Sequence, residues 1–506
     1  MQNNVLDYMD YSVNHCPDKL AFCNESMGLT HREVYDLHRS IASYIHKEGL
    51  YREPVVVFME KHPNTIVAFF GVIAAGCFYV PIDAEMPAAR IELILDNLKP
   101  RLIICDEATL ETARGFNTDA ERVLFGDMTG TEIDTDALMD IHEKALDTDP
   151  IYVVFTSGST GVPKGVVACH RSVIDYIEQL SSVLEFNGDT VFGNQTPLYF
   201  DACLKELYPT LKYGATTYLI PKNLFMFPIK LVEFMNEKQI NTVCWVVSAL
   251  TMISAFGVLD KVVPKYLGNI AFGSEVFPLK QFRKWREALP NARFTNLYGP
   301  TEGTGMCCYY KVDRDFEEGE AIPIGRPFKN TEILLLNDEN KLAGEGETGE
   351  ICLRGTCVTL GYYNNPEKTA ECFVQNPLNT AYPEIIYRTG DIGRRNERGE
   401  LVFVSRKDYQ IKHMGHRIEL GEIEANVNML EAVRTSACIY DKEKSKIVLY
   451  YVGELSERDM MNALKEKVPR YMLPNHFIRI ESMPLTPNGK INRKYLSEQY
   501  AQESAR

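Results

Sequence analysis

The chain has 506 residues, of which 45% are hydrophobic and 24% are charged, a composition typical of a folded globular protein and not of a disordered one. Its 69 acidic residues exceed its 54 lysines and arginines by 15, which argues against a protein that coats nucleic acid, so we expect no nucleic-acid partner. A rule of about 150 residues per domain predicts roughly three folded units.

The cysteine pattern and the N-terminal sequence indicate the cellular compartment of the protein. Thirteen cysteines are scattered along the chain, and their spacing matches neither a zinc site nor a regular disulfide framework. The first residues carry no basic start followed by an apolar run, so we predict no signal peptide. We therefore expect a cytoplasmic protein with reduced and mostly buried thiols.

Short apolar, β-branched runs alternate with helix-like stretches through the first half of the chain. This rhythm predicts βα units that build largely parallel sheets covered by helices, an α/β fold. The predicted strands are residues 55–59, 101–106, 151–155, 216–220, 241–247 and 269–273.

Two stretches, 65–82 and 242–259, are nearly free of charge. A membrane-spanning helix needs about 20 predominantly apolar residues, and both stretches are marginal in length. We interpret each of them as a buried helix running into a buried strand, and we predict no membrane span.

The pattern changes after about residue 315. Residues 331–405 alternate short strands with glycine-rich turns, which predicts an antiparallel, barrel-like part at about 315–405. A small α+β pattern follows, with helices expected at 418–430 and 456–468 and a strand at 446–452. The polar segment 405–417 separates the two patterns, so we predict a large N-terminal domain at 1–407 and a small C-terminal domain at 408–506.

The segment FTSGSTGVPKG, residues 155–165, is the most informative motif. Three glycines let the backbone turn tightly, and four hydroxyl side chains and Lys164 add donors and a positive charge, as a polyphosphate site requires. A Walker A loop would carry Ser or Thr after the lysine, whereas Gly165 stands there. The alternative interpretation is a surface turn rich in Gly and Ser.

Four further polar clusters follow. They are NLYGPTEGT (296–304), YRTGD (387–391), SRKDYQIKHMGHRIELGEIE (405–424) and PLTPNGKINR (484–493). A carboxylate such as Glu302 suits Mg²⁺, and an aromatic ring such as that of Tyr298 can stack on a base. Each cluster taken alone is also compatible with an ordinary turn or a solvated surface.

Together and in this order, the five motifs resemble the adenylate-forming superfamily, specifically the amino-acid adenylation domains of nonribosomal peptide synthetases and the D-alanyl carrier protein ligases. The resemblance extends from residue 29 to residue 493. It implies a large core with a distorted β-barrel and a small mobile lid domain. It also implies that ATP and Mg²⁺ are used to activate an amino acid, which then passes to the thiol of a phosphopantetheinylated carrier protein in trans.

The resemblance also implies roles for individual residues. Lys490 matches the adenylation lysine, Glu302 the Mg²⁺ ligand, Thr301 an α-phosphate contact and Asp408 the hinge. The remaining expected nucleotide contacts are Thr156, Ser157, Gly158, Ser159, Thr160, Gly161 and Lys164 for the phosphates, Gly273, Ser274, Glu275, Asn296 and Tyr298 for the adenine, Asp391 for the ribose, and Arg406 for the ribose or phosphate.

The expected substrate pocket is carried over in the same way. Asp201 matches the residue that pairs with a substrate α-ammonium, although it could instead cap a helix beginning at about Ala202. Bulky Phe272 and Met306 suggest a compact substrate side chain, whereas Lys205, if it points inward, suggests an acidic one. The other pocket positions are Ala202, Cys244, Ile270, Leu297 and Gly305.

Other interpretations stay open at the level of sequence. Ser405 stands where the family usually has Gly, and Cys203 replaces a common Ser, which leaves hinge and pocket details undecided. No carrier-like motif follows the core, so we expect a stand-alone enzyme or an excised domain, with coenzyme A as an alternative thiol. The rival functions are an acyl- or aryl-CoA ligase and a non-catalytic amino-acid or nucleotide-binding protein.

Overall fold

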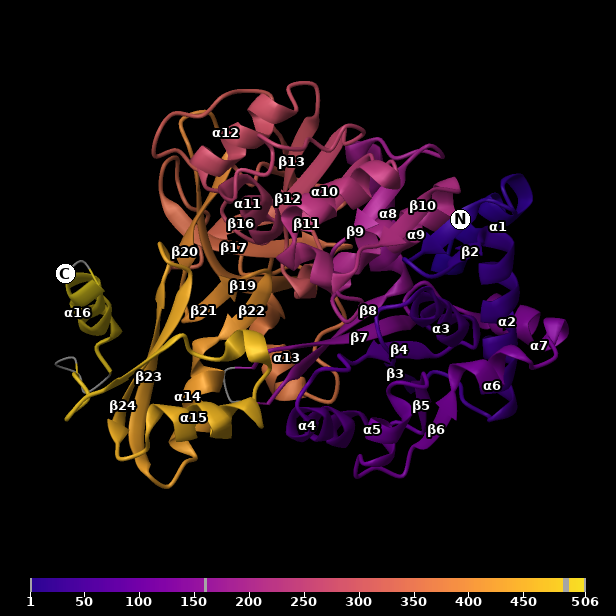
Figure 1. Cartoon of the computed structure of the whole chain (residues 1–506), viewed down its shortest axis with the longest axis horizontal. Helices are drawn as coiled ribbons and strands as arrows, with labels where there is room; N and C mark the ends of the chain where they lie inside the picture. The colour runs from indigo at the N-terminus through magenta and orange to yellow at the C-terminus, as the bar shows by residue number, and fades with distance from the viewer. Residues whose placement is uncertain (1, 159–161, 486–490, 505–506) are drawn as a thin grey trace.

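The computed structural model describes residues 2–158, 162–485 and 491–504. A large part built from βα units holds the N-terminus, and a small α+β part holds the C-terminus at the opposite end of the molecule (Figure 1). This arrangement agrees with the predicted α/β fold and its small C-terminal unit.

A six-stranded sheet, with order β6-β5-β3-β4-β7-β8, forms the first half of the large part. Its strands pair in parallel except for β7 and β8, which are antiparallel and are joined by the glycine-rich loop. The strands are β3 (Pro54–Phe58), β4 (Phe78–Pro81), β5 (Leu102–Cys105), β6 (Glu121–Leu124), β7 (Pro150–Thr156) and β8 (Lys164–Cys169).

A nine-stranded sheet, with order β15-β14-β13-β12-β11-β9-β10-β1-β2, forms the second half. Its centre, from β1 to β13, is parallel. The strands are β1 (Leu20–Cys23), β2 (Gly28–Thr30), β9 (Val191–Asn194), β10 (Thr216–Leu219), β11 (Thr242–Val246), β12 (Asn269–Gly273), β13 (Arg293–Tyr298), β14 (Cys308–Lys311) and β15 (Arg326–Pro327). All six predicted strands are confirmed.

Helices cover these sheets and bury their apolar faces. They are α1 (Tyr8–His15), α2 (His31–Lys47), α3 (Pro63–Ala74), α4 (Ala88–Leu98), α5 (Leu110–Arg114), α6 (Phe125–Thr129), α7 (Thr135–Lys144), α8 (His170–Leu184), α9 (Leu204–Tyr213), α10 (Pro228–Glu237), α11 (Val247–Ala255) and α12 (Leu279–Ala288). Short 3₁₀ turns are η1 (Val5–Asp7), η2 (Asp201–Cys203), η3 (Lys222–Met226) and η4 (Thr301–Gly303).

The two uncharged stretches are both buried. The first is helix α3 followed by strand β4, as predicted. In the second the order is reversed, because strand β11 comes first and helix α11 begins directly after it at Val247, so that part of the prediction is wrong. Among the described residues, no helix is both long and apolar enough to cross a membrane.

A five-stranded antiparallel sheet forms the predicted barrel-like part. Strands β16, β17, β19 and β18 lie side by side in that order, and β20 pairs with β19. The elements are β16 (Thr331–Leu336), β17 (Thr348–Gly355), α13 (Pro366–Cys372), β18 (Phe373–Gln375), β19 (Ile385–Arg395) and β20 (Leu401–Arg406).

The small part begins with a hairpin, β21 (Gln410–His413) and β22 (His416–Glu419), which lies near the centre of Figure 1. Helix α14 begins at Leu420, so the first two residues of the predicted helix 418–430 belong to β22 instead. The predicted strand and second helix are confirmed as β24 and α15. The remaining elements are α14 (Leu420–Asn428), β23 (Val433–Asp441), β24 (Lys446–Gly453), α15 (Glu457–Lys465), η5 (Arg470–Met472), β25 (His476–Arg479) and α16 (Arg493–Ser504).

Candidate active site

The glycine-rich loop lies between β7 and β8. Thr156 is the last residue of β7 and Lys164 the first of β8, and both are buried. A Cβ atom at Gly158 would lie 2.0 Å from the carbonyl oxygen of Val162, so no larger residue fits the turn. The predicted contacts Ser159, Thr160 and Gly161 lie outside the described residues.

Two described donors of this loop are occupied by the small part. The backbone N–H of Gly158 donates to the carboxylate of Glu422 at 3.2 Å, and the hydroxyl of Ser157 donates to the carbonyl of Arg417 at 2.9 Å. Glu422 is buried and also pairs with Arg90 of α4. An anionic oxygen therefore already sits on an N–H group that we predict to bind phosphate.

Glu302, the expected metal ligand, is completely buried in η4. The hydroxyl of Tyr362 donates to one carboxylate oxygen at 2.7 Å, and Arg417 donates to the other at 2.7 Å. Burial alone would raise the pKa of Glu302, but Arg417, Lys164 and the Tyr362 hydroxyl outweigh it and lower the pKa to about 2. The carboxylate is thus ionised at neutral pH, as a hard-metal ligand must be.

The predicted ribose and adenine contacts form one group. The hydroxyl of Tyr298 donates to Asp391 at 2.6 Å, and Arg406 forms an ion pair with the same carboxylate. The amide nitrogen of Asn296 donates to the carbonyl of Pro323 at 2.8 Å. Its oxygen accepts no hydrogen bond from the described residues, so it remains suited to an adenine amino group.

The small part also reaches this group. The ammonium of Lys412, on β21, lies 5.9 Å from the centre of the Tyr298 ring. Burial lowers the pKa of Lys412, whereas Asp391 raises it. Glu275 accepts from the N–H of Ser248 at 2.9 Å and from that of Gly415 in the hairpin turn at 3.0 Å. The hairpin β21–β22 therefore closes over the predicted nucleotide site.

Gly273 and Ser274, which precede Glu275, determine the path of the backbone at the end of β12. A Cβ atom at Gly273 would lie 2.4 Å from the carbonyl oxygen of Leu297, so glycine is required where β12 meets β13. Ser274 has a φ of +70°, a conformation that bends the chain sharply after the strand.

Asp201 is buried at the start of η2. Its side chain caps no helix in the described structure, and one carboxylate oxygen is buried without a hydrogen-bond partner there. Burial raises the pKa of Asp201, although Lys205 and Thr301 act in the opposite direction. The capping alternative is therefore not supported, and the carboxylate is placed to receive a donor.

The other expected pocket residues separate into two groups. Cys244, Leu297 and Met306 belong to the core cluster that also contains the buried residues of α9, and Gly305 lies against the ring of Tyr176. Ile270 and Phe272 belong to the cluster on the other face of the sheet. Ala202 and Lys205 follow Asp201 in the chain, Ala202 on η2 and Lys205 on α9. The compact-pocket argument loses the contribution of Phe272, whose ring packs 5.1 Å from that of Phe277.

The hinge and the lysine are described only in part. The carboxylate of Asp408 accepts from Arg406 at 2.7 and 2.8 Å. Lys490 lies outside the described residues. Its described neighbour Ile491 packs with Ala437, Ile439 and Tyr450, on a different face of the small part from the hairpin.

Sequence reasoning missed the residues of the small part that contact the site. Arg417, Glu422 and Lys412 all lie in the polar cluster 405–424, which was recognised as a motif. Only the fold shows that Arg417 reaches Glu302 across 115 positions of sequence. Tyr362 had no sequence signal at all.

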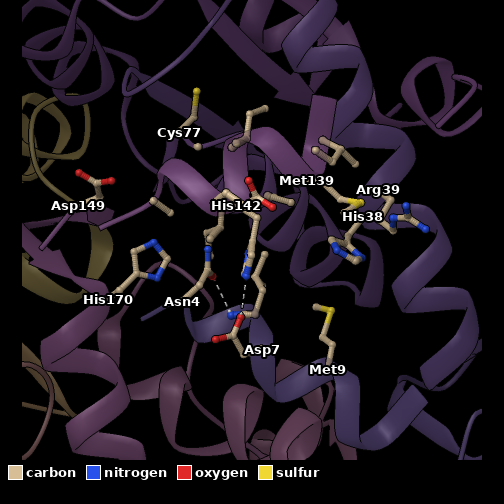
Figure 2. A pocket seen from close by; sticks show the side chains of 18 of the residues that line it. Asn4, Asp7, Met9, His38, Arg39, Cys77, Met139, His142, Asp149 and His170 are labelled. Carbon is tan, nitrogen blue, oxygen red and sulfur yellow. Dashed lines mark hydrogen bonds and ion pairs between the residues drawn. The ribbon is translucent and has the colours of Figure 1, made fainter. Parts of the chain in front are cut away.

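A separate cavity of about 330 Å³ lies between the N-terminal segment, α2 and α7 (Figure 2). Three histidines line it, and His142 lies 3.4 Å from the carboxylate of Asp7. His170 accepts a hydrogen bond from the N–H of Val5 at 3.2 Å. None of the predicted site residues that the structure describes lines this cavity.

Known structures share this fold. The Vibrio cholerae adenylation domain AlmE in complex with glycyl-adenosine-5′-phosphate superposes with a TM-score of 0.85 at 22% identity, covering 99% of this chain and 98% of that one. An artificially fused adenylation–PCP di-domain from Klebsiella oxytoca superposes with a TM-score of 0.80 at 20% identity, covering 95% and 94%. The fold class is that of adenylation domains, as the motifs predict.

Sequence comparison gives the family. Residues 9–363 match the family described as AMP-binding enzyme, and the chain belongs to that family. It is 32% identical over 505 residues to the D-alanine–D-alanyl carrier protein ligase of Bacillus licheniformis, covering 96% of this chain and 97% of the ligase. It is 29% identical over 488 residues to tyrocidine synthase 1 of Brevibacillus parabrevis, covering 95% of this chain but only 44% of that protein. The predicted resemblance is confirmed.

Proposed function

We propose that the protein uses ATP to activate an amino acid as an aminoacyl adenylate, releases pyrophosphate, and then transfers the aminoacyl group to the phosphopantetheine thiol of a carrier protein. The observation that carries this proposal is the buried carboxylate of Asp201, which has one oxygen without a hydrogen-bond partner among the described residues and lies near Thr301 and Glu302. The name of the carrier protein ligase relative, whose match covers 96% of this chain, supports the same activity.

In the first step, a carboxylate oxygen of the amino acid attacks the α-phosphorus of ATP, and the bond from that phosphorus to the pyrophosphate leaving group breaks. The two reactants repel each other, so positive groups must hold them together. Lys164 lies at the end of the glycine-rich loop, where β8 begins. We assign to Lys490 the role of contacting both the attacking carboxylate and the α-phosphate. Asp201 holds the α-ammonium and so fixes the position of the attacking carboxylate.

Glu302 fits a magnesium ligand, because its carboxylate is ionised and faces the same loop. A bound magnesium ion supplies positive charge against the phosphates. Arg417 donates a hydrogen bond to one oxygen of Glu302 in this structure. Glu302 can therefore bind a metal ion through that oxygen once the hairpin β21–β22 has moved away.

In the second step, a thiol sulfur attacks the carbonyl carbon of the adenylate, and AMP leaves. We assign residues 1–407 to the domain that holds the adenylate and 408–506 to a lid that turns about Asp408 between the steps. One orientation presents Lys490, and the other presents the hairpin β21–β22 with Arg417 and Lys412. The contacts of Glu422 and Arg417 with the loop fit the orientation that follows pyrophosphate release.

Exchange of labelled pyrophosphate into ATP tests the first step. The purified protein with Mg²⁺ is given each of the L- and D-amino acids and the corresponding des-amino acids. We expect exchange with at least one amino acid and none with its des-amino analogue. Equal exchange with both would favour an acyl-CoA ligase, and no exchange with any acid would contradict the proposal.

A further inference from the structure

Lys205 on helix α9 is an unusual lysine. Only 3% of its surface is exposed, whereas a lysine on a surface helix normally keeps its ammonium in water. Placing an ammonium in the interior costs free energy unless a partner compensates for the lost hydration. The structure must therefore supply a partner for Lys205, or a ligand must.

Within the described chain, no partner contacts the ammonium of Lys205 directly, although Asp201 and Glu206 interact with it electrostatically. Its Nζ makes no hydrogen bond there and lies within 4.0 Å of no acidic oxygen. Lys61, a half-buried lysine that also interacts with Glu206, differs in this respect. Its ammonium donates to the carbonyls of Asn194 and Gln195 at 3.0 and 3.1 Å.

Asp201 is the complementary group. It opens the 3₁₀ turn η2, which leads directly into α9, and it lies four residues before Lys205. The two charges interact electrostatically, yet no ion pair joins them in the described structure. Both side chains are buried.

Further buried polar atoms near Asp201 also lack partners among the described residues. One oxygen of Asp201 and the hydroxyls of Tyr152 and Tyr176 are buried without hydrogen-bond partners in the part of the chain described. Both tyrosines lie within the electrostatic reach of Asp201. Buried polar groups are almost always satisfied in native proteins, so this cluster indicates a polar ligand.

We infer that the amino acid activated here has a side chain that ends in a carboxylate, and that Lys205 binds this carboxylate while Asp201 binds the α-ammonium. The inference rests on the proposed function and names its substrate class. An aspartate or glutamate carries its two oppositely charged groups a few covalent bonds apart, which matches two charged residues one helical turn apart. A side-chain amide would accept a hydrogen bond but would leave the ammonium without a counter-charge.

Cys244 fits this assignment. It is buried and lies within the electrostatic reach of both Lys205 and Glu206. Its side chain is small, whereas the much larger Phe272 packs on the opposite face of the sheet.

Pyrophosphate exchange with matched pairs of amino acids tests the inference. Aspartate is compared with asparagine and glutamate with glutamine, in both L and D forms, with alanine and glycine as small neutral substrates. We expect kcat/KM for at least one acid to exceed that of its amide by about 10²-fold, because the amide lacks the charge. Exchange with neutral amino acids and with no acidic one would overturn the inference while leaving the proposed function intact. No exchange at all would overturn both.

Variants then assign the effect to Lys205. Lys205→Gln and Lys205→Met should lose about 10²- to 10³-fold in kcat/KM for the acid, because its carboxylate would be buried without a partner, and Lys205→Gln should gain activity with the amide. Lys230→Gln, on the exposed surface of α10, is the control and should match the wild type. Unchanged activity of folded Lys205→Met with the acid would overturn the assignment. If neither variant folds, the comparison of acid with amide in the wild type decides.

Discussion

At the scale of single residues, the site is defined by charges that the protein buries. Asp201, Lys205 and Glu206 are consecutive or near neighbours on η2 and α9, and all three are buried. Burying a charge costs free energy, and buried charges that lie close together are typical of functional sites.

We expect Asp201→Asn to lower kcat/KM for amino-acid-dependent pyrophosphate exchange by about 10²- to 10³-fold, since the substrate ammonium would lose its buried counter-charge. Asp189→Asn is the control, because Asp189 is exposed on the same part of the chain. The measurement is the initial rate of exchange over a range of amino-acid concentrations. A change of less than about threefold, too small for a lost charge pair, would remove Asp201 from the substrate site.

Glu206 gives a prediction of pH dependence. Burial raises its pKa from 4.5 to about 7, although Lys205, Asn194 and Lys61 act to lower it. A carboxyl with a raised pKa holds its proton more tightly in the folded state, so its contribution to stability is complete below pH 4.5 and is lost as the pH rises through 7.

Glu206→Gln removes this titration. We expect the free energy of unfolding of the variant, relative to the wild type, to rise by about 3 kcal/mol between pH 4.5 and pH 8. Urea unfolding at several pH values measures it. A difference that stays constant over this range would show that Glu206 titrates normally in the folded protein.

The roles of some of these residues could be predicted from the sequence, and those of others could not. Asp201, Glu302 and Asp391 stand in motifs whose chemistry is recognisable, and all three are buried where the motifs meet. The burial of Lys205 could not be predicted, because which face of a helix turns inward depends on its neighbours in space. The same reason separates Phe272 from Leu297, since alternate residues of adjacent strands face opposite sides of a sheet.

At the scale of elements, the segment β22–α14 presents charges to the site in a fixed order. Arg417 reaches the expected metal ligand, Glu422 reaches an N–H of the glycine-rich loop, and Glu419 lies 3.8 Å from Lys164. A cation therefore occupies the metal side and an anion the phosphate side. If Glu302 and the loop bind metal and phosphate as we propose, metal-bound pyrophosphate and this segment compete for the same groups.

We expect Arg417→Met to slow aminoacyl transfer to a thiol more than adenylate formation. In the arrangement described here, the variant would leave Glu302 buried without its cation, at a cost of about 3–5 kcal/mol. Pyrophosphate exchange reports the first step, and release of AMP driven by free pantetheine reports the second. We predict at least a tenfold loss in the second and less than about threefold in the first.

The control for this prediction is Arg434→Met, because Arg434 is exposed on the small part. It should leave both steps unchanged. If Arg417→Met lost both activities equally, Arg417 would serve the first step as well, and the contact with Glu302 would not be specific to one orientation.

The order of elements was largely predictable, because strand runs and helix patterns are local. The exceptions are informative. Strand β11 precedes α11, and β22 takes the start of the expected helix at 418, since an apolar run with few breakers does not reveal where a strand ends and a helix begins. The parallel pairing of β24 with β25 connects segments that helix α15 separates, and it has no local signature.

At the scale of the whole molecule, the large and small parts meet through polar contacts at the candidate site. Arg90–Glu422, Arg417–Glu302 and Gly415–Glu275 are all charged or backbone contacts. Interfaces of this polar kind permit relative motion of domains more readily than apolar ones. The sequence predicts the boundary from a change of pattern, but only the fold shows that the first hairpin after it covers the site.

The connection between the parts runs through Asp408. Its carboxylate is held by Arg406, and its backbone N–H donates no hydrogen bond in the described structure. Proline at this position would therefore break no backbone hydrogen bond in the present orientation, but it would fix φ near −65° and remove the freedom that a rotation needs.

We expect Asp408→Pro to reduce aminoacyl transfer to pantetheine by at least tenfold relative to its effect on pyrophosphate exchange, if the transfer step requires a rotation at this residue. Asp408→Ala removes the same carboxylate but keeps a flexible backbone, so it separates stiffness from the loss of the contact with Arg406. The ratio of the two half-reaction rates is the decisive quantity, because a folding defect lowers both rates together. An unchanged ratio in Asp408→Pro would place the pivot elsewhere in the segment that joins β20 to β21.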